Sequence, residues 1–101
     1  MKKLILIIAF FATSLVAENH IINQKGKAFI PHNLNVVVGD TITFKNSDSF
    51  AHNAYTDDDD NEFDIGIQAP GKDSTVTVKA AGEFVIECAI HPNMLLEVIA
   101  K

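Results

Sequence analysis

The feature that most constrains this fold is the two-residue alternation of apolar and polar side chains, which recurs from residue 27 to the end of the chain. No long stretch has the three-to-four-residue spacing of an amphipathic helix. Strands are predicted at 27–30, 34–38, 41–46, 74–79, 83–88 and 96–100, with a short one near 63–67 inside the polar stretch 47–73. Gly, Pro, Asn and Asp separate these segments, which predicts a single all-β domain with an antiparallel β-sandwich architecture.

The N-terminal segment has the layout of a secretory signal peptide. Two lysines precede fourteen uncharged residues, 4–17, which end in the small residue Ala17. We expect cleavage after Ala17, with a cut after Ser14 as the alternative, so that 1–17 is a signal peptide and 18–101 is the mature domain. An uncleaved anchor is the other interpretation, but the apolar run is shorter than the roughly 20 residues that span a bilayer. The segment therefore predicts export to the periplasm, with no stable membrane insertion after cleavage.

The charge of the mature domain excludes one class of partner. Residues 18–101 contain six lysines and thirteen acidic residues, which gives a net charge of −7. Nucleic acids bind basic surfaces, so this balance argues against nucleic acid and fits a protein steered toward a basic partner. The acidic run 56–64 lacks the glycine and glutamate that an EF-hand calcium loop needs. We interpret Asp57–Asp60 as part of a solvated loop, and docking of a basic redox partner is the second interpretation.

The only cysteine lies beside other side chains that bind metals. In the segment ECAIHPNMLL, Cys88 is followed by His91 and by Met94, the one methionine besides the initiator. Alternation in the preceding strand places Cys88 on the core face with Phe84 and Ile86. A lone cysteine in a β-sandwich is usually a small buried hydrophobic residue. A thiolate, imidazoles and a weakly held thioether are, however, the ligand set of a blue-copper site.

That ligand set requires a second histidine from elsewhere in the chain. The candidates are His20, His32 and His52. His20 lies close to the predicted mature N-terminus, and we interpret it and His32 as surface histidines. His52 follows the strand 41–46, and a side chain there could approach the end of the sandwich beside Cys88. Spacing alone gives His52 only a modest preference over His32.

Together these segments resemble a known family. GDTITFKN, AHN and GEFVIECAIHPNM are similar to the corresponding segments of the cupredoxins, the plastocyanin and azurin class of type 1 copper proteins, and the resemblance runs from about Phe29 to the C-terminus. It implies a Greek-key β-sandwich of about seven to eight strands. It also implies one type 1 copper per chain, cycling between Cu(I) and Cu(II), with His52, Cys88, His91 and Met94 as ligands on a short, amicyanin-like loop.

Three positions depart from the family pattern. Ala89 replaces the Ser or Thr that usually follows the cysteine. Because this position and Asn53 brace the two ligand loops in the family, we expect part of that bracing to be lost. Glu87 stands where Tyr is common, and Leu96 replaces a glycine two residues after Met94. None of these changes removes a ligand.

Two other chemistries would use some of the same residues. A Cys–His nucleophile pair lacks an orienting third residue and leaves Met94 unexplained. Zinc would accept His52, Cys88 and His91 in a tetrahedral site, but methionine as the fourth donor favours copper.

The resemblance implies a function in electron transport. We expect a monomeric periplasmic electron-transfer protein, not an enzyme, which exchanges one electron with redox partners such as a c-type cytochrome or a dehydrogenase. In the family the second histidine is the electron exit, which implies His91 here, surrounded by Ala89, Ile90, Pro92 and Leu95. The alternative is a periplasmic copper-binding or delivery protein without electron-carrier turnover. Such proteins tend to use several exposed Met and His residues, whereas residues 18–101 contain one Met.

Overall fold

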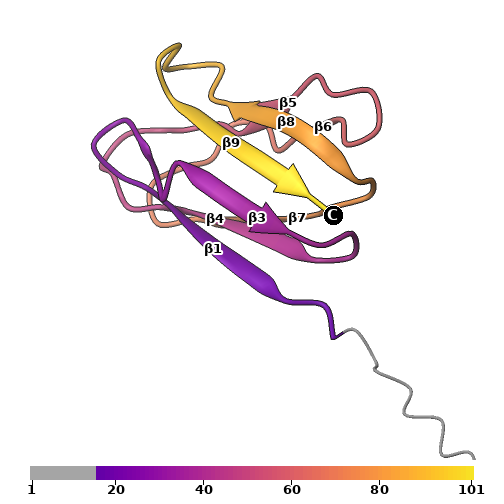
Figure 1. The fold of residues 1–101 in the computed structure, drawn as a ribbon. Helices are drawn as coiled ribbons and strands as arrows, with labels where there is room; N and C mark the ends of the chain where they lie inside the picture. Colours follow the sequence, from indigo (N-terminus) through magenta and orange to yellow (C-terminus); the bar gives the residue numbers. More distant parts are fainter. Residues whose placement is uncertain (1–15) are drawn as a thin grey trace, which may run out of the picture.

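The computed structural model describes residues 16–101, so most of the predicted signal peptide 1–17 lies outside the described residues. The described part of the chain forms nine β-strands and no helix, and it therefore holds no helical segment able to span a bilayer. The strands are β1 (Asn19–Gln24), β2 (Phe29–Ile30), β3 (Asn33–Val36), β4 (Thr41–Asn46), β5 (Tyr55–Thr56), β6 (Phe63–Asp64), β7 (Asp73–Thr77), β8 (Gly82–Glu87) and β9 (Leu95–Ala100) (Figure 1).

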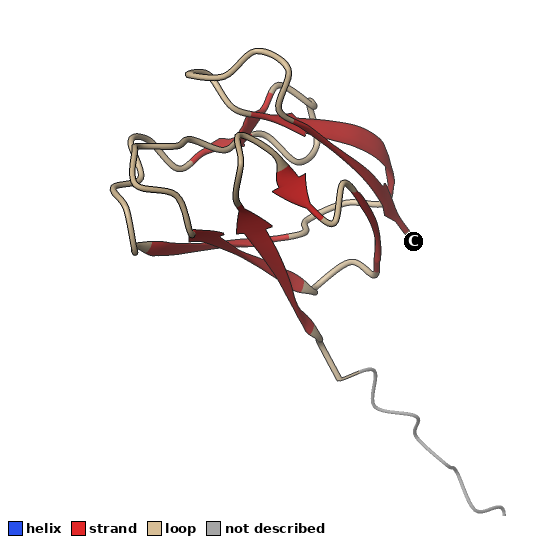
Figure 2. Ribbon diagram, turned by 90° about the vertical axis from the view of Figure 1, so that its left-hand side faces the viewer, coloured by secondary structure: helices blue, strands red, loops and turns tan. Residues whose placement is uncertain are grey.

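The strands form two layers, which confirms the predicted sandwich (Figure 2). One sheet has the order β2-β1-β4-β7, and the other has the order β3-β9-β8-β5-β6. Most strand pairs of the predicted antiparallel sandwich are antiparallel, but β1 pairs with β4 and β3 pairs with β9 in parallel. Parallel neighbours need a crossover connection. For β1 and β4, this connection passes through the other sheet. The chain leaves β2, forms β3 in the second sheet and then returns to form β4.

The core lies between the sheets and is filled by the alternating side chains that the sequence indicated. Ile42 and Phe44 of β4 and Ile86 of β8 are at most 1% exposed. Phe29 packs edge-on against Phe44, with ring centroids 5.9 Å apart. The alternation in β8 also continues as predicted to Cys88, which is buried with the core residues one position beyond the strand.

Two strands were not predicted from the sequence. In β1, Ile22 and Gln24 face the core, and Ile21 faces outward. Because the inward-facing Gln24 is polar and the outward-facing Ile21 is apolar, the alternation of apolar and polar side chains is obscured. The strand forms because it pairs with β4 over its whole length, from Asn19 opposite Thr41 to Gln24 opposite Asn46. β5 has only two residues, too few for a periodic signal.

The two ends of β4 lie at opposite ends of the sandwich. His52 follows the last residue of β4, Asn46, whereas Asp40 precedes its first residue. Because β1 and β4 run in parallel, Glu18, just before β1, lies at the Asp40 end. The connection between β8 and β9, residues 88–94, lies at the His52 end, as the hydrogen bond between Ala89 and Asn53 shows.

Candidate metal centre

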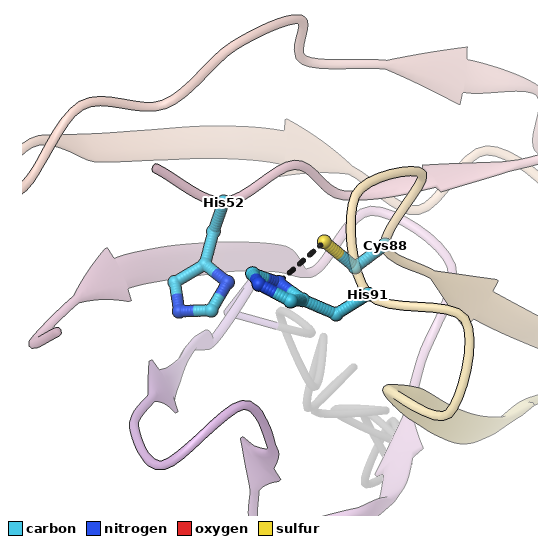
Figure 3. Close-up of side chains that lie close together, drawn as sticks. All are labelled: His52, Cys88 and His91. Carbon is cyan, nitrogen blue, oxygen red and sulfur yellow. Dashed lines mark hydrogen bonds between the residues drawn. The ribbon is translucent and has the colours of Figure 1, made fainter. Parts of the chain in front are cut away.

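Three of the four predicted ligands come together at one end of the sandwich. One ligand atom each from His52, Cys88 and His91 lies within 4.8 Å of the other two (Figure 3). Sγ of Cys88 is 3.7 Å from Nδ1 of His91, and the two imidazole centroids are 4.9 Å apart. His52 comes from the connection after β4, and the other two come from the connection between β8 and β9.

These separations suit donors that share one metal ion. With a metal–sulfur bond of about 2.3 Å and a metal–nitrogen bond of about 2.0 Å, two donors at a tetrahedral angle lie roughly 3.5 Å apart. The Cys88–His91 separation of 3.7 Å is close to that value. Cys88 is a free thiol, so its sulfur is available as a ligand.

The backbone of His52 is fixed by an isolated β-bridge to Gln68. The N–H of His52 donates to the carbonyl of Gln68 over 3.0 Å, and the N–H of Gln68 donates back over 2.8 Å. The amide of Asn46 donates to the carbonyls of Phe50 and Gln68, at 2.9 and 3.0 Å. Segment 46–52 is therefore held by the end of β4 on one side and by Gln68 on the other.

The imidazole of His52 has one committed nitrogen and one free nitrogen. Nε2 lies 2.7 Å from Oδ2 of Asp48. A carboxylate can only accept, so Nε2 carries the proton and Nδ1 keeps its lone pair. The residue is fully buried, and Nδ1 has no hydrogen-bond partner among the described residues. A buried imidazole nitrogen without a partner is destabilising on its own, and a metal ion at the thiol–imidazole cluster would satisfy it.

Asp48 connects His52 to the turn between β1 and β2. Its carboxylate accepts the N–H of Gly26 at 2.9 Å and the N–H of Lys27 at 3.3 Å, in addition to the imidazole. Burial raises the pKa of Asp48, but the hydrogen bonds from Gly26, His52 and Lys27 outweigh it, and the net pKa is lowered. The group that orients His52 is thus an ionised carboxylate at neutral pH.

The other two ligands and Met94 belong to one tight loop. The N–H of Met94 donates to the carbonyl of His91 at 3.0 Å, and the N–H of Cys88 donates to the carbonyl of Met94 at 3.3 Å. Cys88 and Met94 are 3% and 1% exposed, while His91 is half-buried. These backbone bonds hold the predicted fourth ligand directly beside the cysteine.

The bracing of the two ligand loops, part of which was expected to be lost at Ala89, keeps a main-chain hydrogen bond. The main-chain N–H of Ala89 donates to Oδ1 of Asn53 over 3.0 Å, so this brace does not depend on a hydroxyl side chain. The amide nitrogen of Asn53 donates in turn to Asp64 at 2.8 Å and to the carbonyl of Gly66 at 2.9 Å. The residue after His52 therefore ties the loop of Cys88 to the β6 region.

Phe50 is a residue of the site that was not predicted from the sequence. Its ring contacts the rings of His52 and His91 edge-on, with centroids 5.3 and 5.4 Å away. Phe50 is 37% exposed, so it separates both imidazoles from solvent on its side. Burial, followed by the neighbouring His52 and Lys27, lowers the pKa of His91 and favours the neutral imidazole that binds metal. An aromatic residue two positions before a ligand histidine was the only sequence signal.

The two remaining histidines lie outside the cluster. His32 is exposed, as predicted. The prediction for His20 was wrong, because its side chain is only 17% exposed and its Nε2 donates to Oδ2 of Asp40 over 2.9 Å. His20 alternates onto a partly covered face of β1, a strand that the sequence did not reveal.

Of the four consecutive aspartates Asp57–Asp60, one has a structural role. Asp58 is half-buried and accepts hydrogen bonds from the N–H and the side-chain amide of Asn61, at 3.1 and 3.2 Å. Asp57, Asp59 and Asp60 are exposed. Only these three carboxylates are available as the solvated surface that the sequence predicted.

A two-sheet sandwich with one thiol and two imidazoles at its end has the architecture of a copper-binding β-sandwich protein. The comparisons specify the family. The family described as copper binding proteins of the plastocyanin/azurin family matches residues 16–100. The chain therefore belongs to the plastocyanin/azurin family of copper-binding proteins, the cupredoxins, whose metal is copper.

Curated relatives include proteins from plants and from a bacterium. Plastocyanin B'/B'' of Nicotiana tabacum is 35% identical over 79 residues, which cover 65% of this chain and 78% of that one. Chloroplastic plastocyanin of Fritillaria agrestis is 36% identical over 76 residues, covering 63% of this chain and 45% of its own length. The methylamine utilization protein MauL of Methylophilus methylotrophus is 35% identical, over 75% of this chain and 45% of its own. The match thus spans less than half of two of these three relatives.

Solved structures agree with the fold. A copper-containing nitrite reductase from Thermus scotoductus is 27% identical and superposes with a TM-score of 0.76, over 93% of this chain but 25% of its own. An amicyanin in its Cu(I) form is 20% identical with a TM-score of 0.75, over 81% of each chain. The purple cupredoxin of Nitrosopumilus maritimus gives 0.70 at 22% identity, over 81% of this chain and 99% of its own.

Proposed function

We propose that this chain is an exported, periplasmic one-electron carrier whose copper is held by His52, Cys88, His91 and Met94. The observation that carries the proposal is the arrangement of three donors within 4.8 Å, with Nδ1 of His52 buried and unpartnered. Copper bound there would supply a Cu(I)/Cu(II) couple that takes up and releases one electron.

The contribution of the protein would be to keep its ligands fixed during that exchange. His52 is fixed by Gln68 and Asp48, and the cysteine loop is fixed by its own backbone bonds and by the brace from Ala89 to Asn53. A metal site that hardly rearranges between oxidation states exchanges electrons with little reorganisation. Phe50 and the surrounding core would keep water from the copper and so tune its potential.

The electron would leave through His91, which is half-buried beside an apolar surface. Ile90 and Leu95 are 41% and 45% exposed, and Ala89 and Pro92 are also exposed. These four residues are the proposed contact patch for a redox partner such as a c-type cytochrome or a dehydrogenase. No bond of a substrate would be made or broken, so the proposed role is not enzymatic. The nitrite reductase matches over only 25% of its chain, and its activity is not carried over.

Burial of the donors supports a carrier over a delivery protein. His52, Cys88 and Met94 are each at most 3% exposed. A protein that hands copper to a partner needs ligands that the partner can reach, whereas an electron carrier needs only one exposed edge.

The test is spectroscopic and electrochemical. The copper-loaded, oxidised protein should show a strong visible thiolate-to-Cu(II) band and a reversible one-electron wave. Cys88→Ser should remove both and leave the sandwich folded, as checked by circular dichroism. Rapid loss of copper to an equimolar chelator, without a visible band, would support the delivery role instead.

A further inference from the structure

A buried carboxylate lies at the end of the sandwich away from the metal centre. Asp40 is 5% exposed and immediately precedes β4. Its Oδ1 accepts the main-chain N–H of Glu18 at 3.0 Å, while its Oδ2 accepts Nε2 of His20 and the N–H of Val37, both at 2.9 Å. The metal centre does not use this group, since His52 follows the opposite end of the same strand.

The folded domain begins at the residue that Asp40 contacts. Glu18 is bonded on both sides, because its N–H donates to Asp40 and its carbonyl accepts the N–H of Thr41 at 2.9 Å. Within residues 16–101 it is the first residue whose main chain is hydrogen-bonded. Val16 is 79% exposed and Ala17 is also exposed. The predicted cleavage site, the Ala17–Glu18 peptide bond, thus immediately precedes the first residue whose main chain is hydrogen-bonded.

We propose that the Ala17–Glu18 bond is the processing site and that Asp40 binds the α-ammonium group of Glu18 in the mature protein. Hydrolysis by a signal peptidase would break the C–N bond, with water giving a hydroxyl to the Ala17 carbonyl and a proton to the Glu18 nitrogen. The free amine has an ordinary pKa of about 7.7–8.0 and so takes a further proton at neutral pH. This inference rests on the proposed export, but it is independent of the copper chemistry.

The geometry favours the ammonium over the amide that it replaces. An ammonium donor adds attraction between opposite charges to the hydrogen bond with the carboxylate, which a neutral amide donor lacks. Among residues 16–101, Oδ1 has no competing donor, since His20 and Val37 both use Oδ2. The hydrogen bonds from Glu18, His20 and Val37 already lower the pKa of Asp40 to about 2, so the carboxylate is ionised at neutral pH, where the amine is charged. Among the described residues that line the pocket beside Asp40, the other titratable side chains are those of Glu18, His20 and Lys101.

A cut after Ser14 would not produce this pair. The mature chain would then keep an amide at Glu18 and carry exposed Val16 and Ala17 ahead of it. The carboxylate therefore distinguishes between the two cleavage sites that the sequence left open.

The first measurement is the mass of the product when the full 101-residue chain is expressed in an exporting bacterium. We expect a chain that starts at Glu18. A product starting at Leu15, or an unprocessed chain, would overturn the processing site.

The second measurement tests the ion pair with the copper-loaded chain 18–101, which contains all nine strands. The free-amine form and its Nα-acetylated form are compared, each with Asp40 and with Asp40→Asn. The free amine should unfold with an equilibrium constant roughly fivefold smaller than the acetylated form, because only the free amine adds an ion pair to the hydrogen bond with Asp40. That ratio should fall to about one in Asp40→Asn, while Asp59→Asn, at an exposed carboxylate, should keep it.

The pH dependence has a definite sign. Pairing raises the pKa of the amine in the folded state, so the advantage of the free amine should be complete below its unfolded pKa of about 8 and vanish as the pH rises through the folded value. An NMR titration of the Glu18 amine measures that pKa directly, even if Asp40→Asn does not fold. A pKa no higher than about 8, or equal stabilities of the free and acetylated chains, would refute the ion pair.

Discussion

Nε2 of His52 donates to Oδ2 of Asp48, four residues earlier in the chain, over 2.7 Å. A carboxylate that accepts the second ring N–H of a metal ligand makes the imidazole more basic and fixes its orientation. With copper bound, the more basic ligand would stabilise Cu(II) over Cu(I). The same carboxylate is bonded to the backbone of Gly26 and Lys27, so the β1–β2 turn would contribute to the electronic state of the metal site.

Asp48→Asn should therefore raise the reduction potential of the copper and weaken Cu(II) binding by about 10–100-fold. Voltammetry and competition with a Cu(II) chelator measure the two effects. Asp57→Asn, at an exposed carboxylate, is the charge-matched control and should leave both values near those of the unmodified protein. An equal change in both variants would mean that the effect comes from the net charge of the protein and not from the hydrogen bond between Asp48 and His52.

Phe50→Ala should lower the potential, the opposite direction to Asp48→Asn. Removal of the ring admits water to both imidazoles, and water favours the more highly charged Cu(II). The lost edge-on contacts should also reduce the unfolding free energy by about 0.5–1.5 kcal/mol. Phe50→Leu keeps an apolar cover and should retain most of the potential, so identical potentials for the Ala and Leu variants would show that the ring does not exclude water.

His52→Ala should open the copper site and abolish its visible band, whereas His32→Ala should leave spectrum and potential nearly unchanged. His52 is buried within the donor cluster, and His32 is exposed. Absorption spectra and voltammetry of the two variants check the assignment. Loss of the band in His32→Ala alone would move the first ligand to the earlier loop.

Met94→Gln should lower the potential, and Met94→Leu should raise it. A thioether is a soft, weak donor suited to Cu(I), whereas an amide oxygen favours Cu(II), and a leucine donates nothing to the oxidised state. The short loop, closed by the bond from Met94 N–H to the His91 carbonyl, makes the potential sensitive to this side chain. Voltammetry of the three proteins decides the point, and three equal potentials would remove Met94 from the ligand set.

Neutralisation of the exposed carboxylates Asp57, Asp59 and Asp60 should reduce the salt dependence of association with a basic redox partner. Charges beyond about 8 Å are screened at physiological ionic strength, so the rate should fall as salt is added to the unmodified protein. Asp58 must be left in place, because its bonds to Asn61 hold the loop. Stopped-flow rates over a salt series provide the measurement. An unchanged slope in the triple variant would leave the loop as solvated surface.

The sequence by itself determined the strands of the core and the chemistry of the metal loop. Alternation placed Phe84, Ile86 and Cys88 on one face because successive side chains of a strand point to opposite sides. That rule is local, so it holds without knowledge of the rest of the fold. Segment 41–46 was predicted with the bounds of β4 for the same reason.

The tertiary structure alone decided which distant groups meet. Spacing gave His52 only a modest preference over His32, and the resemblance to the family was needed to assign it, because the approach of His52 to Cys88 depends on how the β4 connection packs against the β8–β9 connection. The parallel pairing of β1 with β4 was equally invisible, since it joins residues about twenty positions apart in sequence through backbone bonds that carry no side-chain pattern. That pairing brings Glu18 and His20 to Asp40, and the contacts of the β1–β2 turn bring Gly26 and Lys27 to Asp48. Hydrogen bonds between a carboxylate and a distant backbone N–H depend on three-dimensional approach, which local periodicity does not encode.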